Sequence, residues 1–146
     1  MREDLEQKLY EIAPILYQQK DLEMDKTCMC WGFSCPDTWF DLLFDLSVKL
    51  EELNNKLKEY NTEIQAAQVK EKFGTLHFYY IIFGNGLKNA KEELLLNQTI
   101  DNLIDEAELK SSQICAICGA KATKITKGWI TYVCDECFNK KQGDNI

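Results

Sequence analysis

Four cysteines near the C-terminal end of the sequence have the spacing of a metal site. Cys115 and Cys118 form one Cys-x-x-Cys pair, and 15 residues separate it from a second pair, Cys134 and Cys137. Two thiolates from one pair can reach the same metal ion, and two such pairs complete a tetrahedron. The pattern predicts one structural zinc ion with four protein ligands and no open position for a catalytic water.

The same cysteines could instead form two disulfides, act as a redox motif or hold iron in a rubredoxin-like site. A redox motif needs a single pair at the start of a helix, so two pairs at ligand spacing argue against it. Seven cysteines are an odd number, and 146 residues exceed the usual length of a secreted disulfide scaffold. Iron stays an alternative because a tetrahedron of thiolates accepts either metal.

The residues around the cysteine pairs predict a small zinc-ribbon-like module over residues 112–146. Residues 124–133 alternate in character around Gly128, which favours a short hairpin between the two pairs. Gly119 directly follows the first pair, where a backbone turned toward sulfur often needs a positive φ.

This module could also bind nucleic acid. Lysines could hold phosphates while aromatic rings stack on bases, and the candidate residues are Lys124, Lys127, Trp129 and Tyr132. The alternative interpretation is a solvated basic surface around a buried tryptophan.

A second unusual cluster lies between positions 28 and 39. It contains three cysteines and three aromatic residues, namely Cys28, Cys30, Cys35, Trp31, Phe33 and Trp39. Cys-x-Cys is poor spacing for a metal site and the chain has one histidine, so we interpret these cysteines as small buried apolar residues. The aromatic residues could form an exposed anchor for a partner protein, or they could seal the core beside the following helix.

No residue pattern in the chain indicates catalysis. The lone histidine, His77, lies in a predicted strand, and the sequence has neither a Gly-x-Ser-x-Gly elbow nor a phosphate-binding loop. We therefore expect a protein that is not an enzyme.

Helical periodicity identifies the elements that position these residues. Leu5, Leu9 and Ile12 predict a short amphipathic helix that Pro14 interrupts. A longer helix begins after Asp37 or Thr38, either of which could be its N-cap. Its apolar stripe comprises Trp39, Leu42, Leu43, Leu46, Leu50, Leu53, Leu57 and Tyr60, with charged residues such as Glu51 and Glu52 on the solvated face.

The segments 66–73 and 75–83 predict a β-hairpin around Gly74, and both faces of the second strand are apolar enough to be covered. Residues 87–97 suit a helix or a strand, and Asn97 could cap the element after it. Helical periodicity returns from residue 100 to residue 111. The predicted fold is α+β: a long amphipathic helix packs on a small antiparallel sheet in an acidic body, residues 1–111, followed by the zinc module.

The charge is distributed unevenly along the chain. Residues 1–110 carry 12 basic and 21 acidic side chains, whereas residues 111–146 carry five lysines and three acids. An acidic body repels phosphate backbones, so nucleic-acid contacts are expected from the C-terminal module alone. No apolar run reaches the roughly 18 residues that cross a bilayer, and residues 1–20 are unlike a signal peptide. We expect a soluble, cytoplasmic protein without membrane contact.

Several segments together resemble a group of small, uncharacterised proteins encoded by bacteriophages and prophages, which end in a similar zinc ribbon. The segments are Cys30-Trp-Gly-Phe-Ser-Cys35 through Trp39, Gln68-Val-Lys-Glu-Lys-Phe-Gly-Thr-Leu-His-Phe-Tyr-Tyr80, Ile104-Asp-Glu-Ala107 and the paired cysteines. The resemblance implies the cytoplasm of a bacterial host and a host protein as partner, with inhibition of a host defence protein as one form of action. From this resemblance we assign neither an activity nor a functional residue to this chain.

Three functions are expected on these grounds. The first is a non-enzymatic protein that binds a host macromolecule through the aromatic residues at positions 31–39 or through an acidic helix face. The second is a zinc-ribbon regulatory protein that binds nucleic acid. The third is a protein that sequesters a small nucleotide ligand between the hairpin and the long helix.

Overall fold

A three-stranded sheet forms the centre of the molecule. The computed structural model describes residues 1–143 of the chain, with side chains up to residue 140. The strands are ordered β1 (Phe33–Ser34), β2 (Thr62–Lys72) and β3 (Thr75–Gly84). β2 and β3 form the predicted antiparallel hairpin, and β1 adds to it in parallel, which the sequence did not indicate.

The β2–β3 turn is tight and has two residues. Lys72 pairs with Thr75, and the residues between them, Phe73 and Gly74, have φ values of 54° and 86°. Positive φ at both central positions is the geometry of a type I′ turn, whose twist matches that of the flanking strands.

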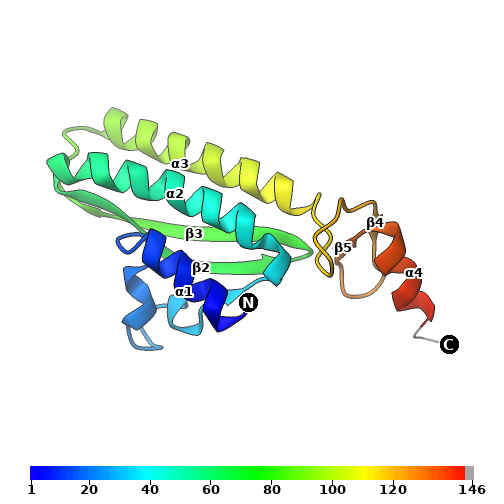
Figure 1. The fold of residues 1–146 in the computed structure, drawn as a ribbon. Helices are drawn as coiled ribbons and strands as arrows, with labels where there is room; N and C mark the ends of the chain where they lie inside the picture. The colour runs from blue at the N-terminus through cyan, green and yellow to red at the C-terminus, as the bar shows by residue number, and fades with distance from the viewer. Residues whose placement is uncertain (144–146) are drawn as a thin grey trace.

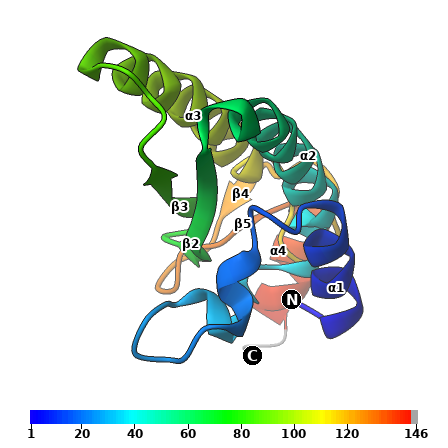
Figure 2. The same cartoon turned by 90° about the vertical axis from the view of Figure 1, so that its left-hand side faces the viewer.

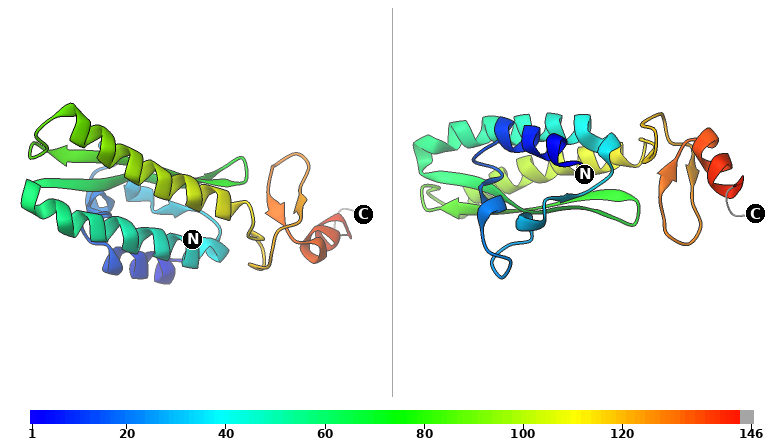
Figure 3. Two further views of the ribbon diagram at one scale, coloured as in Figure 1. Left: turned by 90° about the horizontal axis from the view of Figure 1, so that it is seen from above. Right: turned by 60° about the horizontal axis from the view of Figure 1, so that its bottom comes forward.

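Three helices pack around this sheet, which confirms the predicted α+β fold (Figure 1). They are α1 (Glu3–Ile12), α2 (Phe40–Leu57) and α3 (Ala90–Ser111). α2 and α3 cover one face of the sheet (Figure 2), and seen from above α2 lies between α3 and α1 (Figure 3, left). No helix in the described part of the chain has the length and apolarity needed to span a membrane.

The core confirms the predicted apolar stripe of the long helix. Leu43, Leu46 and Leu50 of α2 are buried against residues of the inner sheet face such as Ile64 and Leu76. The stripe ends earlier than predicted, because the last turn tightens into a 3-10 helix at Lys58–Tyr60 and leaves Tyr60 exposed.

The ambiguous region 87–97 forms the first turns of α3. Its N-cap is Asn89, whose side-chain oxygen accepts a hydrogen bond from the backbone N–H of Glu92 at 2.9 Å. Asn97 lies inside the helix, so its predicted role as a cap is wrong. Of the three consecutive leucines in this region, Leu96 alone packs against the core, whereas Leu94 and Leu95 are 58% and 64% exposed.

The long helix also begins differently from the prediction. A 3-10 turn at Asp37–Trp39 precedes α2, and neither Asp37 nor Thr38 caps the helix with its side chain. The Asp37 carboxylate instead accepts a hydrogen bond from the backbone N–H of Arg2 at 2.9 Å. A contact with the N-terminal segment has therefore replaced the local cap.

The sheet is covered on one face only along β3, so the expectation of two covered faces is wrong. Leu76 and Phe78 point into the core, whereas Tyr79, Ile81 and Phe83 are 42%, 45% and 42% exposed. Both long helices lie on the same side of the sheet, and apolar residues on the other side therefore face solvent.

A buried carboxylate joins three parts of the body. Glu51, predicted to be solvated, is only 7% exposed and accepts hydrogen bonds from the backbone N–H groups of Ile15 and Leu16 at 2.9 and 3.2 Å. Asn54, one turn later, donates to Glu51 at 3.1 Å and binds both the N–H and the carbonyl of Ile64 in β2. The helix break at Pro14 leaves amides that need an acceptor, and α2 supplies it.

We expect Glu51→Ala to lower the free energy of unfolding by about 2–3 kcal/mol, because two buried N–H groups lose their acceptor. Urea denaturation checks this value. Glu52→Ala, on the exposed side of the same helix, is the control and should stay within about 0.5 kcal/mol of the unaltered protein. Equal losses in the two variants would contradict the role given to Glu51.

Candidate metal centre and the surface beside it

The C-terminal residues form a small module beyond the β2–β3 turn (Figure 1). It contains a hairpin of β4 (Lys124–Ile125) and β5 (Tyr132–Val133), followed by α4 (Asp135–Gly143). The hairpin agrees with the sequence pattern, whereas α4 had no signal that we recognised. The last three residues of the expected module, 144–146, lie outside the described part of the chain.

Two turns bring the cysteine pairs together. The first pair lies in a turn closed by a β-bridge between Ile114 and Lys121, and Gly119 in this turn has the expected positive φ, 83°. The second pair lies at the start of α4, where the backbone N–H of Cys137 donates to the sulfur of Cys134 at 3.4 Å.

The four sulfurs converge on one point, as the spacing predicted. The Sγ atoms of Cys115, Cys118, Cys134 and Cys137 all lie within 4.8 Å of one another. The Sγ atoms of Cys118 and Cys134 are 3.7 Å apart. A tetrahedron with metal–sulfur bonds of about 2.3 Å has edges of about 3.8 Å. All seven cysteines are free, so these four sulfurs have the arrangement of metal ligands rather than disulfides.

The electrostatics of the cluster also suit a cation. Burial opposes ionisation of Cys115, yet the backbone N–H groups of Cys118, Cys134 and Ile117 outweigh it and lower the pKa of that thiol to about 6. At Cys137, the neighbouring Cys134 sulfur and burial raise the pKa to about 12. One thiolate is therefore stabilised while its neighbours resist ionisation, and a bound metal ion would supply the positive charge that lets all four ionise.

The module has almost no core of its own. Its buried apolar residues are Cys115, Val133 and Cys137, with Cys134 and Phe138 packed against them at the edge. Because three of these five residues belong to the sulfur cluster, metal binding and folding of the module should be one process.

The module packs on the body at the β2–β3 turn. A Cβ atom at Gly74 would lie 2.8 Å from Cδ2 of Tyr132 and 3.3 Å from Cγ2 of Ile130, so both side chains rest on the glycine backbone. On the other side of the junction, Thr38 approaches Gly119 of the first cysteine turn. The β4–β5 loop extends past the turn toward the side of the sheet away from α2 and α3 (Figure 3, right).

A cavity of about 340 Å³ lies at this junction. The body contributes Trp39, Glu71 and Gly74 to its wall, and the module contributes Ala116, Trp129 and Thr131. The sequence did not indicate this cavity, because its wall combines segments 34–39, 71–74 and 116–131 that meet only in the folded chain.

The candidate nucleic-acid-binding residues differ in the solvent exposure of their side chains. Lys124 and Lys127 are exposed, and Trp129 is 78% exposed, so the alternative of a buried tryptophan is wrong. Thr126 closes the loop by donating to the carbonyl of Trp129 at 2.6 Å, and so small a module has no room to bury an indole ring. Tyr132 is half-buried against Gly74, which leaves it little surface for stacking.

The aromatic residues at positions 31–39 do not form one exposed anchor. Trp31 is 68% exposed, whereas Phe33 and Trp39 are 2% and 1% exposed. Phe33 packs edge-on against Tyr17 with ring centroids 5.1 Å apart. The prediction of partner binding is therefore wrong for Phe33 and Trp39, because their side chains belong to the core.

The three cysteines near these residues differ in environment. Cys28 is exposed, Cys30 is half-buried and Cys35 is buried, so the expectation of burial holds for Cys35 alone. Burial raises the pKa of the Cys35 thiol to about 12, which leaves it protonated at neutral pH. Within residues 1–140, only the other four cysteines converge as potential metal ligands.

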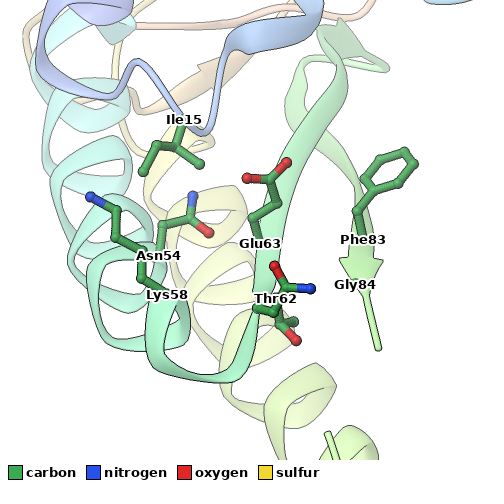
Figure 4. A pocket seen from close by; sticks show the side chains of 8 residues that line it. Ile15, Asn54, Lys58, Thr62, Glu63, Phe83 and Gly84 are labelled. Atoms are coloured by element: carbon green, nitrogen blue, oxygen red, sulfur yellow. The ribbon is translucent and has the colours of Figure 1, made fainter. Parts of the chain in front are cut away.

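A second pocket, of about 310 Å³, lies between the end of α2 and the start of the hairpin, the place expected for a sequestered nucleotide (Figure 4). Its polar side chains already have partners. Glu63 accepts hydrogen bonds from Gln18 and Gln65 at 3.1 and 2.7 Å, and Asn54 is bound to β2. Lys58 is exposed at the rim. One lysine beside a carboxylate does not form a phosphate site, so this pocket does not favour nucleotide binding.

No protein-family model, curated protein or solved structure matches the chain, and its function must be argued from its own residues.

We expect Gly74→Ala to destabilise the metal-bound protein by about 1–3 kcal/mol more than Gly128→Ala does. Both glycines have a positive φ, of 86° and 79°, so both variants carry the same backbone strain. An added Cβ meets the Tyr132 ring only at position 74, because nothing lies within 4 Å of position 128. Thermal unfolding of the two variants checks the difference, and equal midpoints would show that the module is not docked on this turn.

Proposed function

We propose that the chain is a zinc-stabilised, non-enzymatic binding protein that engages another protein at the junction between its metal module and the β2–β3 turn. We call Phe73, Trp129 and Ile130 together the junction surface. These side chains are 69%, 78% and 38% exposed. The observation that carries the proposal is Trp129, a large apolar side chain held in solvent by a braced loop.

Hydrogen bonds within its loop distinguish Trp129 from an ordinary exposed residue. The hydroxyl of Thr126 donates to the Trp129 carbonyl at 2.6 Å and accepts from the backbone N–H of Thr131 at 2.9 Å. Tyr132 then fixes the base of the loop on Gly74. An indole on such a support loses little conformational freedom on binding, and tryptophan is enriched among residues that dominate binding energy.

Zinc is the metal we assign to the four thiolates. A closed tetrahedron of four cysteines is typical of structural zinc, and four protein ligands leave the ion no position for a reacting water. In this proposal the ion holds the module together and the binding surface is the functional part. Iron would occupy the same sulfurs and would give the protein a visible absorption that zinc lacks.

The partner we propose is a protein of a bacterial host cell. The ground for this choice is the resemblance of motifs within residues 28–138 to those of small phage-encoded proteins, which no match to a family model or a curated protein supports. Inhibition of a host defence protein is the form of action that we propose. Inhibition by binding needs only that the surface covers its target, and it requires no catalytic group.

We expect Trp129→Ala to weaken capture of a single saturable partner from bacterial lysate by at least tenfold, because a hot-spot tryptophan typically contributes about 2 kcal/mol or more. Trp31→Ala is the control, since it removes an equally exposed indole elsewhere. Removing the metal with a chelator should also abolish capture, because the loop then loses its support. Capture that survives Trp129→Ala but not Trp31→Ala would place the surface elsewhere, and failure of the unaltered protein to capture any partner would contradict the proposal.

Nucleic-acid binding is the second candidate, and one observation favours it. Lys124 and Lys127 are exposed on the hairpin that carries Trp129. Positive side chains for phosphates and an exposed ring for base stacking, which are typical of proteins that bind single-stranded nucleic acid, therefore occur on one hairpin. The acidic residues of the body oppose it.

If nucleic acid is the partner, Lys124→Glu with Lys127→Glu should weaken binding to a single-stranded oligonucleotide, and affinity should fall steeply with salt. Fluorescence anisotropy at two salt concentrations measures both effects. Lys56→Glu with Lys58→Glu, two exposed lysines at the end of α2 and in the turn after it, makes the same change in net charge and is the control. Binding that is insensitive to salt, or equally weakened by this control, would remove this candidate.

A further inference from the structure

We infer that the junction cavity receives an arginine or lysine side chain of the partner protein. This inference rests on the proposed function and specifies the chemistry of the same site. Three features of the cavity carry it: a carboxylate that forms no ion pair, an exposed tryptophan, and the volume of a single long side chain.

Glu71 supplies the negative charge. One of its carboxylate oxygens accepts a hydrogen bond from the backbone N–H of Gly74 at 2.6 Å, which fixes the carboxylate at the cavity wall. Among residues 1–140 it has no salt-bridge partner within 4.0 Å, and no lysine or arginine lines the cavity. The α-amino group of Met1 is a positive charge at the same wall, where it donates to the carbonyl of Phe33 at 3.1 Å and forms no ion pair with Glu71 within 4.0 Å. Glu71 therefore has no ion-pair partner among the described residues.

Trp129 supplies an aromatic wall. Its side chain is 78% exposed and lines the same cavity as Glu71, and a guanidinium or ammonium group over its face would gain a cation–π interaction. Trp39 also lines the cavity, but its side chain is 1% exposed, and its buried indole N–H cannot bind a guanidinium or ammonium group, which has no acceptor atom.

The size and charge of the cavity narrow the choice of occupant. At about 340 Å³ it is at the small end of ligand pockets, which typically span about 300–1,000 Å³. It accommodates one long side chain rather than a folded segment. A phosphate in the cavity would face the Glu71 carboxylate, and the one positive group at the wall is the Met1 ammonium, which is hydrogen-bonded to the Phe33 carbonyl. The cavity offers a phosphate no lysine or arginine, although lysines lie on the hairpin outside it.

Because three of the ten residues that line this cavity belong to the metal module, the site is complete only when the module is folded. Ala116, Trp129 and Thr131 all come from the segment that the cysteine turns organise. Binding of the cationic side chain is therefore expected to require the metal, although the ion itself does not contact the ligand.

The test is a titration of the full, metal-loaded chain with a short blocked peptide, acetyl-Gly-Arg-Gly-amide, followed by the indole N–H resonance of Trp129. The matched probe contains citrulline, which has the shape of arginine without its charge. We expect a saturable shift with arginine, a similar response to the lysine peptide, and at least about fivefold weaker binding of citrulline.

Glu71→Gln is the decisive variant, because glutamine keeps the acceptor for Gly74 and removes the charge. It should weaken binding of the arginine peptide by about fivefold. Glu59→Gln, in the exposed 3-10 turn after α2, makes the same change in net charge and should leave binding unchanged. Unaltered resonances elsewhere confirm that each variant is folded.

The inference would be overturned by equal binding of citrulline and arginine, by full binding of the arginine peptide to Glu71→Gln, or by a larger response to an eight-residue oligothymidylate than to arginine. Absence of any response to the arginine peptide would overturn it as well. These failures are separable from failure of the proposed function. If Trp129→Ala abolishes capture of the partner while Glu71→Gln does not, the proposal that the junction surface binds a partner is retained. The inference that the cavity receives a cationic side chain is then rejected.

Discussion

Four sulfur atoms that converge within 4.8 Å, in a module with three buried apolar residues, are the constraint on which the rest of this structure depends. Without a cation the thiolates repel one another, and without the thiolates the module has no interior. A bound ion would therefore decide whether the β4–β5 hairpin has a defined shape. That hairpin carries Trp129 in its loop and Tyr132 in β5, so the ion would also decide whether an aromatic surface and a cavity form beside the sheet.

The body provides the fixed support that the module needs. Its β2–β3 hairpin ends in a tight turn whose Gly74 accepts the ring of Tyr132 directly on its backbone. The hairpin is in turn anchored to α2 through Asn54, and the Glu51 carboxylate ties the N-terminal segment to the same helix. These contacts hold the start of β2 and the N-terminal segment, at the end of the hairpin away from the turn. A sheet that carries a loop beside a candidate metal centre is suited to recognition by shape and charge.

Local patterns in the sequence were sufficient for most elements and for the cysteine cluster. Cysteine spacing, the leucine stripe of α2 and Gly74 between two β-rich segments each depend on near neighbours, and each prediction was confirmed. Residues whose role depends on distant partners were not predictable. Trp31, Phe33, Trp39 and Trp129 look alike as aromatic residues, yet two are core and two are exposed because of the segments that the fold places around them. Glu51 has the pattern of a surface residue, and only the helix break at Pro14, 37 positions earlier, explains its burial.

X-ray absorption at the zinc edge of the purified protein tests the central claim most directly, because it reports the metal and its ligands together. The account predicts zinc bound by four sulfurs at about 2.3 Å, with no nitrogen or oxygen neighbour. A ligand set with fewer sulfurs and a bound oxygen would reveal an open position at which a water could react. That result, or a protein whose cysteines are oxidised to disulfides without metal, would contradict the account.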